Sequence, residues 1–210
     1  TAFVDEVTSH EVSHQWWGHM VGWDTYRDQW LSEGMATFSA SLFLEYTEKT
    51  PKKYLDYWEQ ARKELTDKNN FGMRSIDAGP IYLGWRANTQ KTAGASYDLM
   101  YYKGGYVIHM LRMMMQDAKT GDTDFIAMMK DFAATHRDQN ASLASFTAIV
   151  NRHAKPYMKI AQPGEMEWFF YQWILGKEIP RYTFNYTVEP DGDKFRLKAT
   201  IQQSEVSANF

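Results

Sequence analysis

The spacing of apolar side chains predicts a helix at the start of the chain. Between positions 3 and 21, apolar residues and two histidines recur at steps of three and four, which places them on one stripe of an α-helix. Gly22 is the predicted end of this helix. Both histidines therefore face inward. The stripe consists of Phe3, Val7, His10, His14, Trp17 and Val21.

Helical periodicity continues through most of the chain up to position 175. A second helix is predicted over about 29–48, and a third, with a proline in its first turn, over about 51–65. Positions 66–96 lose this periodicity and are interrupted by glycines, which predicts a long loop that could line a cleft. Further helices are predicted over 98–117, 123–136, 142–154 and 165–175.

The last thirty residues show a different pattern. Apolar residues alternate with polar ones on both sides of an Asp191-Gly192 turn, which predicts a β-hairpin. We therefore expect a mainly α-helical domain over 1–180, and the first strands of a β domain over 181–210. The alternating residues are Tyr182, Phe184, Tyr186, Phe195, Leu197 and Ala199.

Composition and charge narrow the classes of protein. The chain has 210 residues, 44% of them hydrophobic, so it can bury a sizeable core. The formal charge is -3 and the 23 basic residues are scattered, which argues against a nucleic-acid partner. The sequence contains no run of about 18 apolar residues that would predict a membrane-spanning segment. The lack of cysteine excludes thiolate metal ligands and leaves the compartment open.

The segment HEVSH at 10–14 carries the strongest chemical signal. Two imidazoles four residues apart lie on one face of a helix, close enough to bind one Zn²⁺ ion. Glu11 lies next to the first of them, where a carboxylate can reach a metal-bound water without binding the metal. The sequence therefore predicts His10 and His14 as zinc ligands and Glu11 as a general base.

A third ligand is predicted at Glu33, on the second helix. Eighteen residues separate Glu33 from His14, and two antiparallel helices joined by a short turn would bring the carboxylate opposite the imidazoles. Three protein ligands leave the fourth position of a single zinc ion open for water or substrate, which is typical of a catalytic site and not of a structural one.

Three segments together resemble the gluzincin aminopeptidases, the family of aminopeptidase N and leukotriene hydrolase. These are HEVSHQWWG at 10–18, DQWLSEGMAT at 28–37 and YYKGG at 101–105. The resemblance implies the helical lobe of a thermolysin-like zincin catalytic domain, followed by the first strands of a β-sandwich. It also implies that Tyr101 stabilises the oxyanion of the tetrahedral intermediate. Physically, a phenol can donate a hydrogen bond to developing negative charge without ionising.

The sequence also departs from this family. Many relatives carry a glutamate seven residues after the third ligand, where it supports a zinc-bound histidine, whereas this chain has Ala40. Thr37 or Asp28 is the expected replacement, because metal-bound imidazoles usually donate their second N–H to an acceptor. The family's amine-binding segment and N-terminal β lobe precede the zinc helix. We therefore expect both, together with downstream domains, to belong to missing parts of the same polypeptide.

These observations predict a zinc-dependent metallopeptidase, an aminopeptidase type by resemblance, that acts on a peptide substrate through Glu11 and Tyr101. Two alternatives stay open, which are an epoxide hydrolase of the leukotriene branch and a catalytically silent relative used as a scaffold. A silent relative usually loses ligands, whereas His10, His14 and Glu33 are all present. Because half of the substrate cleft is expected elsewhere, we expect the 210-residue chain alone to be weakly active or inactive.

Overall fold

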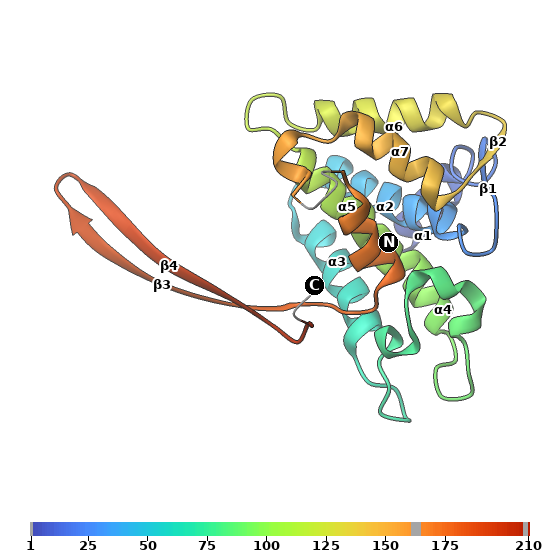
Figure 1. The fold of residues 1–210 in the computed structure, drawn as a ribbon, viewed down its shortest axis with the longest axis horizontal. Helices are drawn as coiled ribbons and strands as arrows, with labels where there is room; N and C mark the ends of the chain where they lie inside the picture. Colours follow the sequence, from blue (N-terminus) through green and yellow to red (C-terminus); the bar gives the residue numbers. More distant parts are fainter. Residues whose placement is uncertain (1, 161–164, 208–209) are drawn as a thin grey trace. The chain divides into compact units, whose positions relative to one another are not determined.

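The computed structural model describes residues 2–160, 165–207 and 210, which form two compact units. Unit 1 covers Thr1–Lys177 and is mainly α-helical, and unit 2 covers Glu178–Phe210 and is a β-hairpin (Figure 1). The mainly α fold class is therefore confirmed for the larger part of the chain. In the described residues, no helix combines the length and apolar character that crossing a bilayer requires.

Helix α2, at Trp30–Thr47, forms the core of unit 1. It packs against α1 at Ala2–Ser13, α3 at Lys52–Thr66 and α5 at Gly104–Met115 (Figure 1). Most of its residues are buried, including the polar ones in its first two turns. A helix that is buried nearly all round is hydrophobic nearly all round, which explains the apolar sequence predicted as helix at 29–48. That prediction is confirmed.

The first helix is shorter than predicted. It ends at Ser13, and Val21, predicted as its last inward residue, begins strand β1 at Val21–Trp23. After Ser13 the backbone N–H groups of His14, Gln15 and Trp16 bond to the residue three positions before, and Gly18, with φ 116°, a conformation that favours glycine, then turns the chain away from the helical path. A Cβ atom at Gly18 would also lie 2.6 Å from Oγ of Ser32, so glycine lets this turn approach α2. The prediction that Gly22 ends the helix was wrong for this reason.

The turn after α1 is tied to a distant part of the chain. Strand β1 pairs in parallel with β2 at Gln139–Ala141, which the sequence did not predict. The buried Asp28 reinforces this connection, because its Oδ1 accepts a hydrogen bond of 2.8 Å from the backbone N–H of Leu143. Its Oδ2 accepts one of 2.6 Å from the Thr25 hydroxyl. Asp28 therefore anchors the start of α2 to the start of α7.

Helical turns and helices account for the rest of unit 1. The long predicted loop contains two 3-10 helices, and the predicted helix at 98–117 contains a π-helical turn, η3 at Leu99–Lys103. Helices α6 and α7 lie side by side (Figure 1). The other elements are η1 at Ser75–Ala78, η2 at Ile81–Ala87, α4 at Ala95–Asp98, α6 at Thr123–Thr135, α7 at Leu143–His153, η4 at Pro156–Met158, α8 at Glu167–Phe170 and η5 at Tyr171–Leu175.

Unit 2 is an antiparallel hairpin of β3 at Arg181–Asp191 and β4 at Lys194–Ser204. The predicted strands are confirmed, and the turn lies one residue later than predicted, at Gly192-Asp193. Cross-strand pairs such as Phe184–Ile201 and Val188–Leu197 place the large apolar residues on one face, and these side chains are exposed. An exposed apolar face on an isolated pair of strands is typical of a hairpin that belongs to a larger sheet.

A very close helix contact in unit 1 joins α2 to the start of α5. A Cβ atom added to Gly34 would lie 2.8 Å from the carbonyl carbon of Gly104 and 2.9 Å from its Cα. Because neither residue has a side chain, the two backbones touch directly. This contact brings Glu33, which precedes Gly34, close to the π turn that precedes Gly104.

We predict that Gly34→Ala destabilises the protein, although helix propensity alone would predict that it stabilises α2. Alanine in a helix interior is normally more stable than glycine by about 1 kcal/mol. Here the added methyl group meets backbone, and overpacking of this kind costs about 1–3 kcal/mol. Urea unfolding should therefore show a lower free energy of unfolding. As a matched control, Gly105→Ala should cost less, because the nearest atom to its Cβ would be in the Thr37 side chain at 3.0 Å, and the nearest backbone atom, the Gly34 oxygen, lies at 3.6 Å. An unchanged or higher stability of Gly34→Ala would contradict the prediction.

Candidate metal centre

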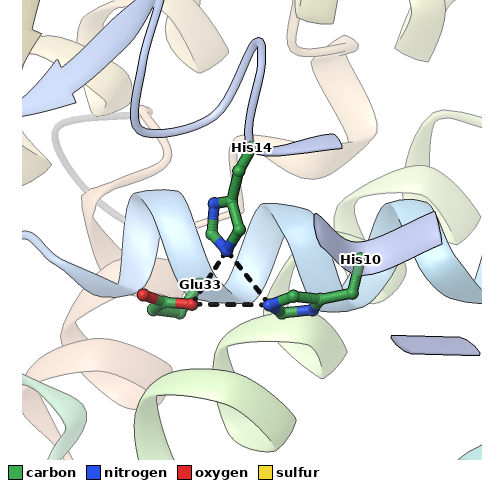
Figure 2. A group of neighbouring side chains, drawn as sticks. All are labelled: His10, His14 and Glu33. Atoms are coloured by element: carbon green, nitrogen blue, oxygen red, sulfur yellow. Dashed lines mark hydrogen bonds and ion pairs between the residues drawn. The ribbon is translucent and has the colours of Figure 1, made fainter. Parts of the chain in front are cut away.

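Three side chains, from α1, the turn directly after it and α2, point to one place (Figure 2). His10 lies in the last turn of α1, His14 directly follows this helix, and Glu33 lies in the first turn of α2. The Nε2 atoms of the two histidines are 3.1 Å apart. Oε2 of Glu33 lies 3.5 Å from Nε2 of His10 and 3.3 Å from Nε2 of His14. The structure therefore brings all three predicted ligands together.

The spacing of these three atoms fits a tetrahedral zinc ion. Two ligand atoms bound to one zinc at about 2.1 Å lie about 3.4 Å apart when the geometry is tetrahedral. The three observed separations, from 3.1 to 3.5 Å, lie close to this value. Oε2 of Glu33 is buried and has no hydrogen-bond partner in the described chain. A metal ion would satisfy this oxygen, because buried polar atoms are rarely left without a partner.

A backbone carbonyl orients His14. Its Nδ1 lies 2.7 Å from the carbonyl oxygen of Trp17, and this contact favours a proton on Nδ1 and a free lone pair on Nε2. The Ser32 hydroxyl donates to the same carbonyl at 2.9 Å. The expectation that Thr37 or Asp28 orients a ligand was wrong. Asp28 binds Thr25 and Leu143, and the buried Thr37 hydroxyl has no partner among the described residues.

The electrostatics of the site favour an ionised carboxylate. Burial alone would raise the pKa of Glu33, but the neighbouring His10, His14 and Tyr101 side chains outweigh it and lower the pKa to about 2. The position of Glu33 in the first turn of α2 favours negative charge as well. In return, Glu33 raises the pKa of His14. Glu33 is therefore negatively charged at neutral pH, as a metal ligand must be.

The two predicted catalytic residues lie beside this cluster. Tyr101 stacks on His10 with ring centroids 5.5 Å apart and an angle of 5° between the rings. Burial and the charge of Glu33 raise the pKa of Tyr101, so its phenol stays protonated at neutral pH. Glu11 is exposed, and it lines a cavity of 240 Å³ together with His10 and Tyr101. The arrangement provides a base and a hydrogen-bond donor next to three candidate ligands.

The chain belongs to peptidase family M1, because the domain that defines this family matches residues 2–173. The resemblance to gluzincin aminopeptidases is therefore confirmed. The chain is 25% identical to human endoplasmic reticulum aminopeptidase 2 over an alignment that covers 93% of this chain and 21% of the relative. It is 27% identical to aminopeptidase N of Oryctolagus cuniculus, with 86% of this chain and 18% of the relative covered. The chain thus spans about a fifth of these relatives.

Solved structures show the same fold. The M1 zinc metallopeptidase from Deinococcus radiodurans superimposes with a TM-score of 0.56 at 23% identity. The superposition covers 84% of this chain and 34% of the Deinococcus protein. Yeast LTA4 hydrolase in complex with bestatin superimposes with a TM-score of 0.58 at 13% identity, covering 81% of this chain and 26% of the yeast protein. The Deinococcus radiodurans protein is itself named a zinc metallopeptidase of family M1.

Lys103, two positions after Tyr101, is a buried lysine for which the sequence pattern predicted no role. Lys103 ends the π turn and is 2% exposed, and its ammonium group donates one hydrogen bond of 3.0 Å to the carbonyl oxygen of Gly176. Burial lowers the pKa of Lys103 to about 8. The bond connects the turn that carries Tyr101 to the end of η5, which gives Lys103 a structural role beside the candidate metal centre.

We predict that Lys103 makes the stability of the protein rise with pH. Its pKa falls from 10.5 to about 8 on folding, so the unfolded chain binds more protons between these values. The free energy of unfolding then increases with pH by up to about 1.4 kcal/mol per pH unit. Lys103→Met removes this slope, whereas Lys49→Met, at an exposed lysine, should keep it. Urea unfolding between about pH 8 and 10 measures the slopes, and equal slopes for wild type and Lys103→Met would disprove the assignment.

Proposed function

We propose that this chain forms the catalytic core of a zinc-dependent metallopeptidase of aminopeptidase type. His10, His14 and Glu33 are its zinc ligands. The observation that carries the proposal is the set of three ligand atoms separated by 3.1 to 3.5 Å, one of which is a buried carboxylate oxygen without another partner. Three protein ligands leave one position of a zinc ion free, as hydrolysis requires.

The chemistry supplied by a bound zinc ion is Lewis acidity, which lowers the pKa of water and polarises a carbonyl group. Glu11 accepts the proton of the attacking water and passes it to the leaving amine. Its position supports this role, because Glu11 is adjacent to the ligand His10 but points into the neighbouring cavity, where a substrate has access.

Tyr101 donates a hydrogen bond to the oxyanion that forms when water adds to the peptide carbonyl. Three observations support this role. The ring of Tyr101 stacks on His10, the residue lines the cavity, and its raised pKa keeps the phenol protonated near neutral pH. A neutral donor that is held in place before the reaction stabilises developing charge without a cost of reorganisation.

The aminopeptidase type is supported by the names of the relatives, endoplasmic reticulum aminopeptidase 2 and aminopeptidase N. The substrates of this chain stay a proposal, because it spans about a fifth of either relative. No specific observation favours the epoxide hydrolase or the silent scaffold. The similarity to yeast LTA4 hydrolase is a similarity of fold at 13% identity.

We predict that the chain binds one zinc ion and that Glu33→Ala abolishes this binding. At a free zinc concentration one hundred times the dissociation constant, binding stabilises the folded wild type by about 2.7 kcal/mol, which raises its melting temperature. Glu33→Ala should show neither the shift nor bound metal after dialysis. Glu64→Ala, at an exposed glutamate on α3, is the matched control and should bind like wild type. Stoichiometric zinc in Glu33→Ala would refute the ligand assignment.

We predict that Glu11→Gln keeps the zinc ion but loses hydrolysis. The amide is close in size to the carboxylate but cannot accept the proton of the attacking water, so turnover should fall by several orders of magnitude. Metal analysis and hydrolysis of aminoacyl-arylamides at high protein concentration measure the two effects separately. A parallel assay with an epoxide substrate tests the alternative reaction. Unchanged hydrolysis by Glu11→Gln would exclude Glu11 as the base.

A further inference from the structure

The cavity beside the metal centre has a second carboxylate that the proposed mechanism does not use. Glu6 lies one helical turn before His10 and lines the same cavity of 240 Å³ as His10 and Glu11. The Glu6 side chain is half-buried and forms no hydrogen bond or ion pair with any residue that the structure describes. Burial raises the pKa of Glu6, and the proximity of His10 opposes this effect. A partly buried carboxylate without a partner is a binding group for a cation.

A buried hydroxyl in the same cavity also lacks a partner. Thr37 lines the cavity, is only 2% exposed, and its Oγ1 forms no hydrogen bond within the described chain. A buried hydroxyl that stays unpaired costs free energy, which a ligand with hydrogen-bond donors would recover. The unpaired hydroxyl of Thr37 is thus a second observation, independent of the acidic residues, that points to a ligand in this cavity.

Aromatic rings form the walls of the cavity. Tyr57, Tyr97, Tyr101 and Tyr102 all line it. The rings of Tyr97 and Tyr101 are stacked with centroids 3.9 Å apart, and Tyr102 meets Tyr97 edge-on at 6.0 Å. No lysine or arginine from the described residues lines the cavity. The faces of aromatic rings attract cations, and guanidinium groups in particular stack on them.

We propose that this cavity binds the basic side chain of a peptide substrate, arginine or lysine, and that Glu6 determines this specificity. The inference rests on the proposed function, because His10 and Glu11 place the cavity beside the scissile bond. The exposed Val7 gives the methylene groups of the substrate side chain an apolar contact. At 240 Å³, the cavity is smaller than pockets for drug-sized ligands, roughly 300–1,000 Å³, and suits a single side chain.

The test compares two ligands that differ only in the charge of the side chain. Arginine hydroxamate and citrulline hydroxamate carry the same metal-binding group and have side chains of nearly the same shape, but only the first is cationic. Calorimetric titration of the zinc-loaded chain should give tighter binding of the arginine compound by roughly tenfold or more, as a hydrogen bond between charged groups predicts. Glu6→Gln should reduce this ratio to near one.

Asp5→Asn is the matched control, because it removes the same charge from the adjacent residue. Asp5 lines a different cavity, of 340 Å³, together with Trp16 and Phe43, so the ratio should stay as in wild type. Equal affinities for both hydroxamates in wild type, or an unchanged ratio in Glu6→Gln, would overturn the inference alone. Failure of both hydroxamates to bind would overturn the proposed function together with it.

Discussion

The candidate metal centre depends on the contact between the backbones of Gly34 and Gly104. Glu33 precedes one glycine in α2, and the π turn with Tyr101 precedes the other, so the same contact fixes the ligand and the phenol. His10 in α1 and His14 directly after it complete the site, because α1 packs against α2. Because interiors are close-packed, a side chain at this contact would displace both groups at once. The positions of Glu33 and Tyr101 therefore depend on a contact between two glycines at which no side chain fits.

Much of the site could be predicted because its information is local in the sequence. His10 and His14 are four residues apart, one in the last turn of α1 and the other directly after this helix, and this short spacing brings their rings together. Glu33 required a second inference, that a short turn joins two helices, and α2 at Trp30–Thr47 confirms the helix on which it lies. The hairpin was equally local, because the alternation predicts both strands, although the loop of the observed register is Gly192-Asp193, one residue after the predicted turn.

The parts that could not be predicted involve the backbone or distant segments. The acceptor for His14 is the carbonyl of Trp17, and a main-chain group has no signature in the sequence. The turn that follows the end of α1 at Ser13 brings Gly18 against Ser32, which is a tertiary contact. The pairing of β1 with β2 joins residues more than a hundred positions apart. The periodicity at 98–117 predicted a helix but could not distinguish its π turn from regular α-helix.

Three glutamates around this site differ in role because their surroundings differ. Glu33 is buried at the start of α2 between two imidazoles, which keeps it ionised and suits it to a metal ion. Glu11 is exposed beside a ligand, where it can exchange protons with water and substrate. Glu6 is half-buried among tyrosines without a partner of its own, so it is the carboxylate with capacity left for an external cation. In the proposed site, one residue type would thus provide a ligand, a base and a specificity group, since environment determines which protonation state and which partner each carboxylate prefers.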